Sequence, residues 1–161
     1  MHELPKALSI DHVVDRIYIS GWRATLYEDF LRQGEIIHVL KLYQGIPSFP
    51  DDFDVCEVGI EDGEPVPAEA FQHGVRFVVD HINVGRAVLV MCGAGISRSA
   101  TFVLASLIER KYDLREAFRL LRQKHPEATP HPALWISLIQ HYALSYTLDD
   151  ALEWMREDRG G

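Results

Sequence analysis

Short apolar runs alternate with amphipathic stretches along most of the chain. Residues 13–20, 36–42, 53–60 and 87–91 are apolar or alternating over the length of a strand, with many β-branched side chains. The first run predicts an opening strand or hairpin that ends at Gly21, and the other three predict further strands. Loops rich in Gly, Pro and Asp lie between them.

Apolar side chains recur at helical spacing in the remaining segments. The expected helices cover residues 24–33, 68–83, 97–110, 113–124, 132–143 and 147–156. Asp113, with Glu116 three residues later, has the capping-box pattern of a helix start. Strands that alternate with helices, followed by a helical C-terminal half, indicate an α/β fold with a central, mostly parallel sheet of four to five strands and helices on both faces. No repeat or linker interrupts the pattern, so we expect residues 1–161 to form a single domain.

The composition of the 161-residue chain narrows the class of protein. Apolar residues make up 47% and charged residues 25%, as in ordinary globular chains. The formal net charge of −8 argues against a nucleic-acid binder, which needs a basic surface, and against docking on anionic membranes. The two cysteines form no disulfide framework, and the first six residues contain no apolar core of signal-peptide length. We therefore expect a cytoplasmic protein, and a monomer.

Residues 86–101 hold the densest set of chemical features in the chain. An apolar strand leads into a turn that contains Gly93 and Gly95 and then directly into a helical pattern. The N–H groups of such a turn and of the first helical turn have no intrahelical partner, and the helix dipole favours negative charge there. The stretch therefore predicts a backbone cradle for an anion.

Cys92 and Arg98 lie in this stretch at the spacing Cys-x5-Arg. The positive field of a helix N-terminus favours a thiolate nucleophile, and a guanidinium grips two phosphate oxygens at once. The full string is Cys-Gly-Ala-Gly-Ile-Ser-Arg-Ser, and here the chain resembles the cysteine-dependent protein tyrosine phosphatases, most closely the small dual-specificity phosphatases. The resemblance extends from about Ile10 to Tyr142 and is specific at residues 92–99.

The resemblance implies a phosphatase-like fold and the hydrolysis of phosphotyrosine, with phosphoserine and phosphothreonine as further substrates, through a cysteinyl-phosphate. In this chemistry Cys92 would attack phosphorus, Arg98 would bind the phosphoryl oxygens, and Ser99 would stabilise the departing thiolate. The phosphate would also be held by the cradle residues Gly93, Ala94, Gly95, Ile96, Ser97 and Arg98. The expected partner is a phosphorylated protein or peptide. Neither a cofactor nor a metal ion is expected, because the chain has no His-Glu-x-x-His string and no paired cysteines.

The general acid is expected from another loop at the same edge of the sheet. Asp62 follows a predicted strand and precedes Cys92 by thirty residues, a separation similar to that of the family's aspartate loop. Asp62 would protonate the leaving oxygen and then act as base on the hydrolytic water. Glu61 and Glu64 are neighbouring carboxylates that must be told apart from it, and without the resemblance the whole run is a solvated acidic turn.

Two positions depart from the family's pattern. The family usually has a histidine directly before the nucleophile, whereas this chain has Met91, which donates no hydrogen bond to a thiolate. The substitution implies slower turnover or a shifted pH optimum. The family often has Asn after the residue equivalent to Pro130, whereas this chain has His131, which either anchors the cradle from behind or simply starts the following helix. Cys56 lies in a strand pattern and is expected in the core rather than as a resolving thiol.

Two alternatives use the same cradle for another purpose. In the first, a catalytically weak or inactive module only binds phosphorylated partners, and Met91 is the feature that favours it. In the second, the phosphatase acts on a non-protein phosphate such as a phosphoinositide or a nucleic-acid 5′ phosphate. Residues 93–96 contain no lysine and the chain is acidic, which disfavours polyanionic substrates.

Overall fold

A five-stranded sheet forms the centre of the computed structural model, which describes residues 9–159. The strands run in the order β1-β2-β5-β3-β4. Their bounds are β1 Ile10–Val14, β2 Ile17–Ser20, β3 His38–Lys41, β4 Asp54–Glu57 and β5 Val88–Met91. β1 and β2 form an antiparallel hairpin, and every other neighbouring pair is parallel. The expected opening hairpin and the mostly parallel sheet are both confirmed.

The helices lie close to the predicted segments. They are a 3₁₀ helix at Trp22–Leu26, α1 Glu28–Gln33, α2 Ala68–Asn83, α3 Arg98–Glu109, α4 Leu114–Lys124, α5 Pro132–His141 and α6 Leu148–Arg159. The single helix expected at residues 24–33 is wrong, because Tyr27 leaves the helical region at φ −123° and ψ 37°. Glu28 and Asp29 then begin α1, where acidic side chains suit the helix dipole. Asp113 caps α4 as predicted, accepting from the N–H groups of Arg115 and Glu116.

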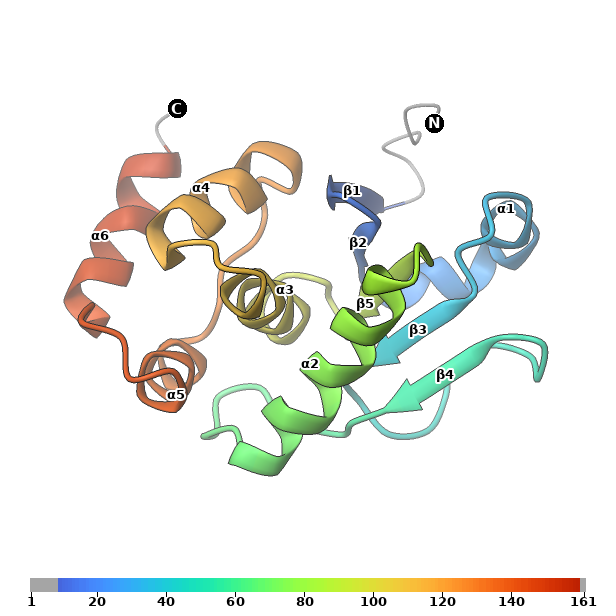
Figure 1. Cartoon of the computed structure of the whole chain (residues 1–161), viewed down its shortest axis with the longest axis horizontal. Coiled ribbons are helices and arrows are strands. Elements are labelled where there is room, and N and C mark those ends of the chain that lie inside the picture. The colour runs from blue at the N-terminus through green and yellow to red at the C-terminus, as the bar shows by residue number, and fades with distance from the viewer. Residues whose placement is uncertain (1–8, 160–161) are drawn as a thin grey trace.

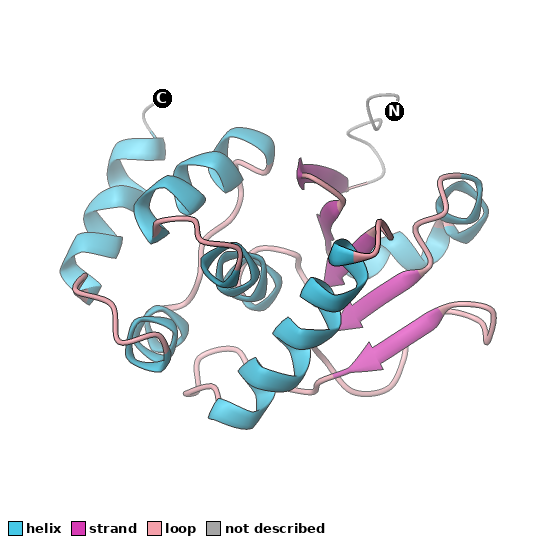
Figure 2. Ribbon diagram, in the orientation of Figure 1, coloured by secondary structure: helices cyan, strands magenta, loops and turns pink. Residues whose placement is uncertain are grey.

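Helices cover both faces of the sheet, as expected, but unequally. α2 and α3 lie directly on one face, α4 and α5 pack against α3, and α6 packs against α4 and α5 (Figure 1). The opposite face carries a smaller apolar cluster that includes Leu31 of α1. Figure 2 shows the consequence: the sheet occupies one side of the molecule and the helical C-terminal half the other. The larger core lies between them.

Side chains alternate between these two cores along each strand. Val88 and Val90 of β5, with Cys92 just beyond, belong to the larger core, whereas Leu89 and Met91 belong to the smaller one. The loops after β2, β3, β4 and β5 all leave from the carboxyl edge of the parallel strands. Segments that are far apart in the sequence therefore meet at that edge.

No helix among residues 9–159 has the length and apolar character needed to cross a bilayer. The first six residues, on which the expectation of no signal peptide rests, lie outside the described part of the chain.

Candidate active site

The predicted cradle forms at the carboxyl end of β5, in the loop from Cys92 to the start of α3 at Arg98. Cys92 is almost fully buried, with 2% of its surface exposed, and its N–H donates to Ser20 O at 3.3 Å. Ser97 occupies the N-cap position of α3 but makes no side-chain capping hydrogen bond. The positive end of a twelve-residue helix therefore faces the loop with no capping hydrogen bond from the Ser97 side chain.

Three carbonyl groups of the loop are held by donors outside it. Gly93 O accepts from Trp22 N–H at 2.9 Å, and Ile96 O accepts from Thr129 N–H at 2.6 Å. Gly95 O lies 2.6 Å from His125 Nε2. In a planar trans peptide the C=O and the following N–H point in opposite directions. The N–H groups of residues 94, 96 and 97 therefore face away from these donors, toward the inside of the loop, where an anion would sit.

Close backbone contact explains the glycines of the loop. Gly95 has φ +78°, and a Cβ at this position would lie only 2.5 Å from Gly21 N. A Cβ at Gly21 would in turn meet Gly93 O at 2.7 Å. Both the left-handed backbone at Gly95 and the packing of the loop against the end of β2 thus need a residue without a side chain.

Arg98 turns back over the loop toward Cys92. Its Nη1 donates to Ile60 O at 3.0 Å, and a Cβ on Gly93 would lie 3.2 Å from its Nη2. The guanidinium is therefore held beside the residue that follows the thiol. Leu42 O lies 3.5 Å from the same Nη1, so the loops after β3 and β4 both fix the side chain. The structure thus places the Arg98 guanidinium beside the loop that begins at Cys92, and its role there stays a prediction.

Asp62 reaches the same loop from the segment after β4. Its carboxylate accepts from the Ser97 hydroxyl at 2.6 Å, and Ser97 Oγ accepts from the N–H of His131 at 2.9 Å. The His131 ring lies against Gly63, while its Nδ1 accepts from Ala133 N–H at 3.0 Å. Of the two interpretations left open for His131, its side chain starts the helix, and only its backbone supports the cradle.

The hydroxyl of Ser99 contacts the Cys92 thiol. Its Oγ is 3.1 Å from Cys92 Sγ, and the residue is fully buried. Met91 belongs to the opposite core and contributes no polar group to the thiol. Ser99 is thus the hydroxyl in contact with Cys92.

Sequence reasoning missed two residues near the cradle. His125 is buried behind it and contacts Gly95 O. Tyr43 follows β3, and its hydroxyl donates to Pro47 O at 2.6 Å. Burial and the charge of the neighbouring Cys92 raise the pKa of Tyr43 to about 12, although Arg98 opposes the shift. The sequence offered one signal for Tyr43: it follows a predicted parallel strand, and residues that follow such strands meet at the carboxyl edge of the sheet.

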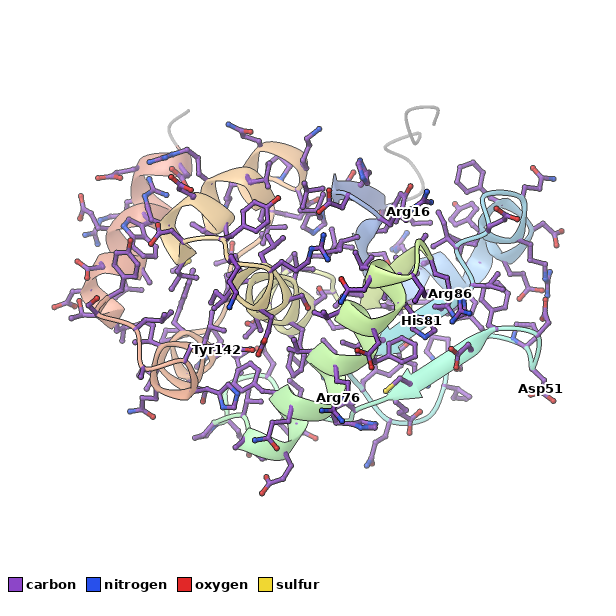
Figure 3. All side chains as sticks on the ribbon, in the orientation of Figure 1. Arg16, Asp51, Arg76, His81, Arg86 and Tyr142 are labelled. Carbon is purple, nitrogen blue, oxygen red and sulfur yellow. The ribbon has the colours of Figure 1, made fainter. Side chains whose placement is uncertain are left out.

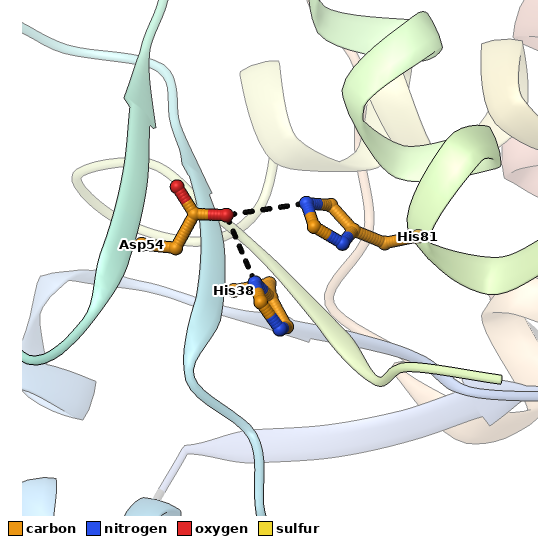
Figure 4. Close-up of side chains that lie close together, drawn as sticks. All are labelled: His38, Asp54 and His81. Carbon is orange, nitrogen blue, oxygen red and sulfur yellow. Dashed lines mark hydrogen bonds and ion pairs between the residues drawn. The ribbon is translucent and has the colours of Figure 1, made fainter. Parts of the chain in front are cut away.

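A second group of ionisable side chains lies at the opposite edge of the sheet, where the parallel strands β3 and β4 begin. Asp54 Oδ2 is 2.9 Å from His38 Nδ1 and 3.2 Å from His81 Nε2 (Figure 4). The two imidazole rings stack at 4.0 Å with 24° between their planes, and both approach the same carboxylate oxygen. Arg86 Nη1 lies 3.4 Å from His81 Nδ1, and both residues are labelled at the end of α2 in Figure 3. We interpret the group as a hydrogen-bonded cluster rather than a metal centre.

Cys56 lies away from the cradle on β4, with its Sγ 3.4 Å from His73 Nε2 on α2. Burial raises the pKa of this thiol, and the charge of Asp54 adds to the shift. Two hollows of about 670 and 470 Å³ are lined by residues of α2 and of the β1–β2 hairpin, and neither is lined by a cradle residue.

Comparison with known proteins points in one direction. The family described as "Dual specificity phosphatase, catalytic domain" matches residues 17–144. Dual specificity protein phosphatase 1B of Arabidopsis thaliana is 34% identical over 84% of this chain and 83% of its own length. MAP kinase phosphatase with leucine-rich repeats protein 2 of Dictyostelium discoideum is 26% identical over 75% of this chain but only 18% of its own length. A mouse dual specificity phosphatase crystallised with zinc tungstate has the same fold, with a TM-score of 0.78, 21% identity and coverage of 88% and 89% of the two chains.

Proposed function

Because the chain belongs to the dual specificity phosphatase family, we propose that it hydrolyses phosphotyrosine, and also phosphoserine and phosphothreonine, through a cysteinyl-phosphate intermediate. The family match makes the chain a protein phosphatase. The proposed substrate is a phosphorylated protein or peptide. We further propose a cytoplasmic, monomeric enzyme whose single catalytic domain spans residues 1–161.

In the first step the Cys92 thiolate attacks phosphorus, and the bond from phosphorus to the leaving oxygen breaks. Asp62 gives its proton to that oxygen, so a neutral alcohol or phenol departs. The Arg98 guanidinium and the inward N–H groups of the loop bind the equatorial oxygens, on which negative charge resides in the transition state.

In the second step water attacks the phosphorus of the intermediate. The Asp62 carboxylate takes a proton from the water, and the sulfur–phosphorus bond breaks to return the thiolate and release phosphate. Ser99, at 3.1 Å from the sulfur, donates its hydroxyl hydrogen to the departing thiolate. The thiolate and the protonated Asp62 are thereby regenerated: the proton that Asp62 gave to the leaving oxygen is replaced by one from water, and the hydroxide of that water stays on the released phosphate.

One observation carries this proposal more than any other. Cys92 and Arg98 bracket a loop whose outer carbonyls are tied down, and Asp62 is bonded to that same loop through Ser97. Nucleophile, anion clamp and acid thus occupy one small region. A mere binding module would need the loop and the clamp, but it has no use for a buried thiol in contact with a serine or for an acid held beside it.

Hydrolysis of nitrophenyl phosphate by the purified protein tests the activity. The wild-type protein releases nitrophenol, and Cys92→Ser lowers the rate by about 10⁴-fold or more while tungstate, a phosphoryl mimic, still binds. Cys56→Ser is the matched control, because it removes the other thiol and leaves the rate unchanged. Tungstate binding by a wild-type protein that releases no nitrophenol would instead support the binding module.

Exposed apolar side chains lie in the cradle loop itself and in the segments after β2 and β3, which leave from the same edge of the sheet, and they bear on the choice of substrate. Trp22 is 39% exposed and Ile96 is 37% exposed, and Ile46 in the loop after β3 is 90% exposed. Such side chains favour apolar residues next to the phosphorylated one, since contact removes both surfaces from water. Phosphopeptides with Leu or Val flanks should therefore have a higher kcat/KM than peptides with Glu flanks. A higher turnover on phosphoinositide vesicles than on any phosphopeptide would favour the non-protein alternative.

A further inference from the structure

The middle carbonyl of the cradle is held by a side chain, whereas its neighbours are held by backbone groups. His125 follows the last residue of α4 and is 3% exposed. Its Nε2 lies 2.6 Å from Gly95 O, at the point where the loop has φ +78°. Trp22 N–H and Thr129 N–H, which hold the carbonyls of Gly93 and Ile96, do not titrate. Among these three anchors of the loop, His125 alone is an acid–base group.

The other ring nitrogen of His125 faces carboxylates. Nδ1 lies 2.6 Å from Asp11 Oδ2 on β1 and 3.1 Å from Glu127 Oε1 in the loop after α4. A carbonyl oxygen and an ionised carboxylate are acceptors only, so both ring nitrogens must carry hydrogen. The arrangement therefore favours the imidazolium form, and it leaves no nitrogen lone pair for a metal ion.

The charged neighbours of His125 agree with this form. Burial alone would lower the pKa of His125, but hydrogen bonds to Asp11 and the Gly95 carbonyl, with the charges of Glu127 and Asp11, raise it above its ordinary value. Arg122 on α4 is the cationic side chain nearby, and it donates to Ala128 O at 2.5 Å and to Thr129 Oγ1 at 3.3 Å.

The contact with Gly95 sets the direction of an N–H group inside the cradle. Since Gly95 C=O points outward to His125, the Ile96 N–H of the same planar peptide points inward. The imidazolium also adds a positive charge behind the site of a phosphate dianion. Glu127, at 55% side-chain exposure, neutralises less of that charge than Asp11, at 24%, because solvent screens it.

We propose that His125, kept protonated by Asp11, is a positioning residue that turns the Ile96 N–H into the cradle, and that the cradle loses affinity for tetrahedral dianions when His125 loses its proton. The identity of that dianion as a substrate phosphate rests on the proposed function. A neutral His125 ring has one N–H hydrogen for two acceptors, the Asp11 carboxylate and the Gly95 carbonyl. The hydrogen stays on Nδ1, because the charged carboxylate is the stronger acceptor. Nε2 then turns a lone pair toward Gly95 O, and the peptide between Gly95 and Ile96 is pushed out of its binding orientation.

Tungstate binding, measured by calorimetry across neutral to alkaline pH, tests this without requiring turnover. In the wild-type protein affinity falls as the pH rises through the pKa of His125. His125→Gln keeps an N–H donor for Gly95 O but does not titrate, so its affinity is about tenfold weaker at neutral pH and lacks that alkaline loss. His125→Ala loses the donor and lowers kcat/KM for nitrophenyl phosphate by about 10²-fold. Asp11→Asn moves the alkaline loss of affinity to lower pH, and Glu127→Gln moves it less.

His81→Gln is the matched control, because it removes another partly buried histidine beside an aspartate, at the far edge of the sheet. Its tungstate affinity and pH profile should equal those of the wild-type protein. An alkaline loss in His125→Gln identical to that of the wild-type protein overturns the proposal.

Nuclear magnetic resonance of ¹⁵N-labelled histidine gives a second test that needs no variant to fold. The His125 ring should stay doubly protonated at a pH where His81 is already neutral, and a neutral His125 ring under those conditions also overturns the proposal. A wild-type protein that binds tungstate in this pH-dependent way but hydrolyses no phosphate ester would remove the proposed function and leave the positioning role of His125 intact.

Discussion

Two histidines sit beside aspartates at opposite edges of the sheet, and their protonation is pushed in opposite directions. His125 contacts Asp11 behind the cradle, and its pKa is raised, with hydrogen bonds and carboxylates outweighing burial. His81 contacts Asp54 at the far edge, and its pKa is lowered by burial and by the neighbouring His38 and Arg86, against the effect of Asp54. An aspartate alone therefore does not decide the charge of a histidine in this protein.

The group at the second ring nitrogen differs between the two histidines and contributes to the difference, beside burial and the charge of His38 at His81 and the Asp11 hydrogen bond at His125. For His125 that group is the Gly95 carbonyl at 2.6 Å, which accepts a hydrogen and so favours the cation. For His81 it is the Arg86 guanidinium at 3.4 Å, which donates and carries positive charge. The stacked ring of His38 lies beside it as a further titratable neighbour. The first environment favours the cationic ring beside the proposed cradle, whereas the second disfavours it.

The largest difference in activity is expected between substitutions of Arg98 at the cradle and of Arg86 beside His81. Arg98→Ala should lower kcat/KM for nitrophenyl phosphate by about 10³–10⁵-fold, because it removes the positive charge that stabilises the transferring phosphoryl group. Arg86→Ala, made as the control, should leave kcat/KM within about twofold, since it lies near His81. Equal losses in the two variants would show that the cradle is not the site of chemistry.

A smaller difference in activity is expected between substitutions of Asp62 at the cradle and of Asp54 beside His81. Asp62→Asn should lower kcat by about 10²-fold and leave KM nearly unchanged, because the amide binds Ser97 but has no proton to give the leaving oxygen. Asp54→Asn should leave both constants unchanged. Glu61→Gln and Glu64→Gln distinguish the three neighbouring acids. If Glu61→Gln or Glu64→Gln lowers kcat while Asp62→Asn does not, the assignment of Asp62 as the acid is wrong.

The two histidines should also shape the pH dependence of folding stability in opposite ways. His125 has a raised pKa when folded, so its contribution is present below its unfolded pKa and is lost as the pH rises through the folded value. His81 has a lowered pKa, so its contribution is present above its unfolded pKa and is lost as the pH falls through the folded value. The free energy of unfolding can be measured with urea from acid to alkaline pH. His125→Gln should reduce its loss on the alkaline side, and His81→Gln should reduce its loss on the acid side. Identical pH profiles for the two variants would contradict the opposite shifts.

The smallest effect should follow the removal of one charge from the far edge. Arg86→Gln takes away the cation beside His81 Nδ1 and should move the titration of the His81 ring to higher pH. Nuclear magnetic resonance of the histidine rings measures this directly, and the titration of His125 in the same spectra is the internal control. A shift to lower pH would mean that Arg86 acts on His81 through packing rather than charge.

Most of the fold follows from periodicity alone. The 68–83 helix and the capped helix after Asp113 lie where their patterns predict them, since spacing and capping act over a few residues. The helix at 24–33 is the exception, because Tyr27 interrupts it where no Gly or Pro marks a break. Residues 92–99 are likewise close together in the chain, so the loop and helix start that they form were predictable from a single stretch.

Other contacts of the site depended on folding. Ser97 was expected in the cradle through its backbone N–H, and its hydroxyl binds Asp62, which is 35 residues away in the sequence. The Asp11–His125 contact joins residues 114 positions apart and had no sequence signal. His131 matched one of its two interpretations, and nothing in the sequence favoured that one over the other.

The amino-acid sequence by itself determined the elements, the anion-binding loop and the thiol and guanidinium within it. These depend on backbone preferences and hydrogen bonds between residues close together in the chain. Only the tertiary structure decided which acid reaches the loop and which histidine supports it from behind. Those contacts arise from the order of the strands in the sheet and from the packing of α4 against β1, and a pattern of neighbouring residues carries no record of either.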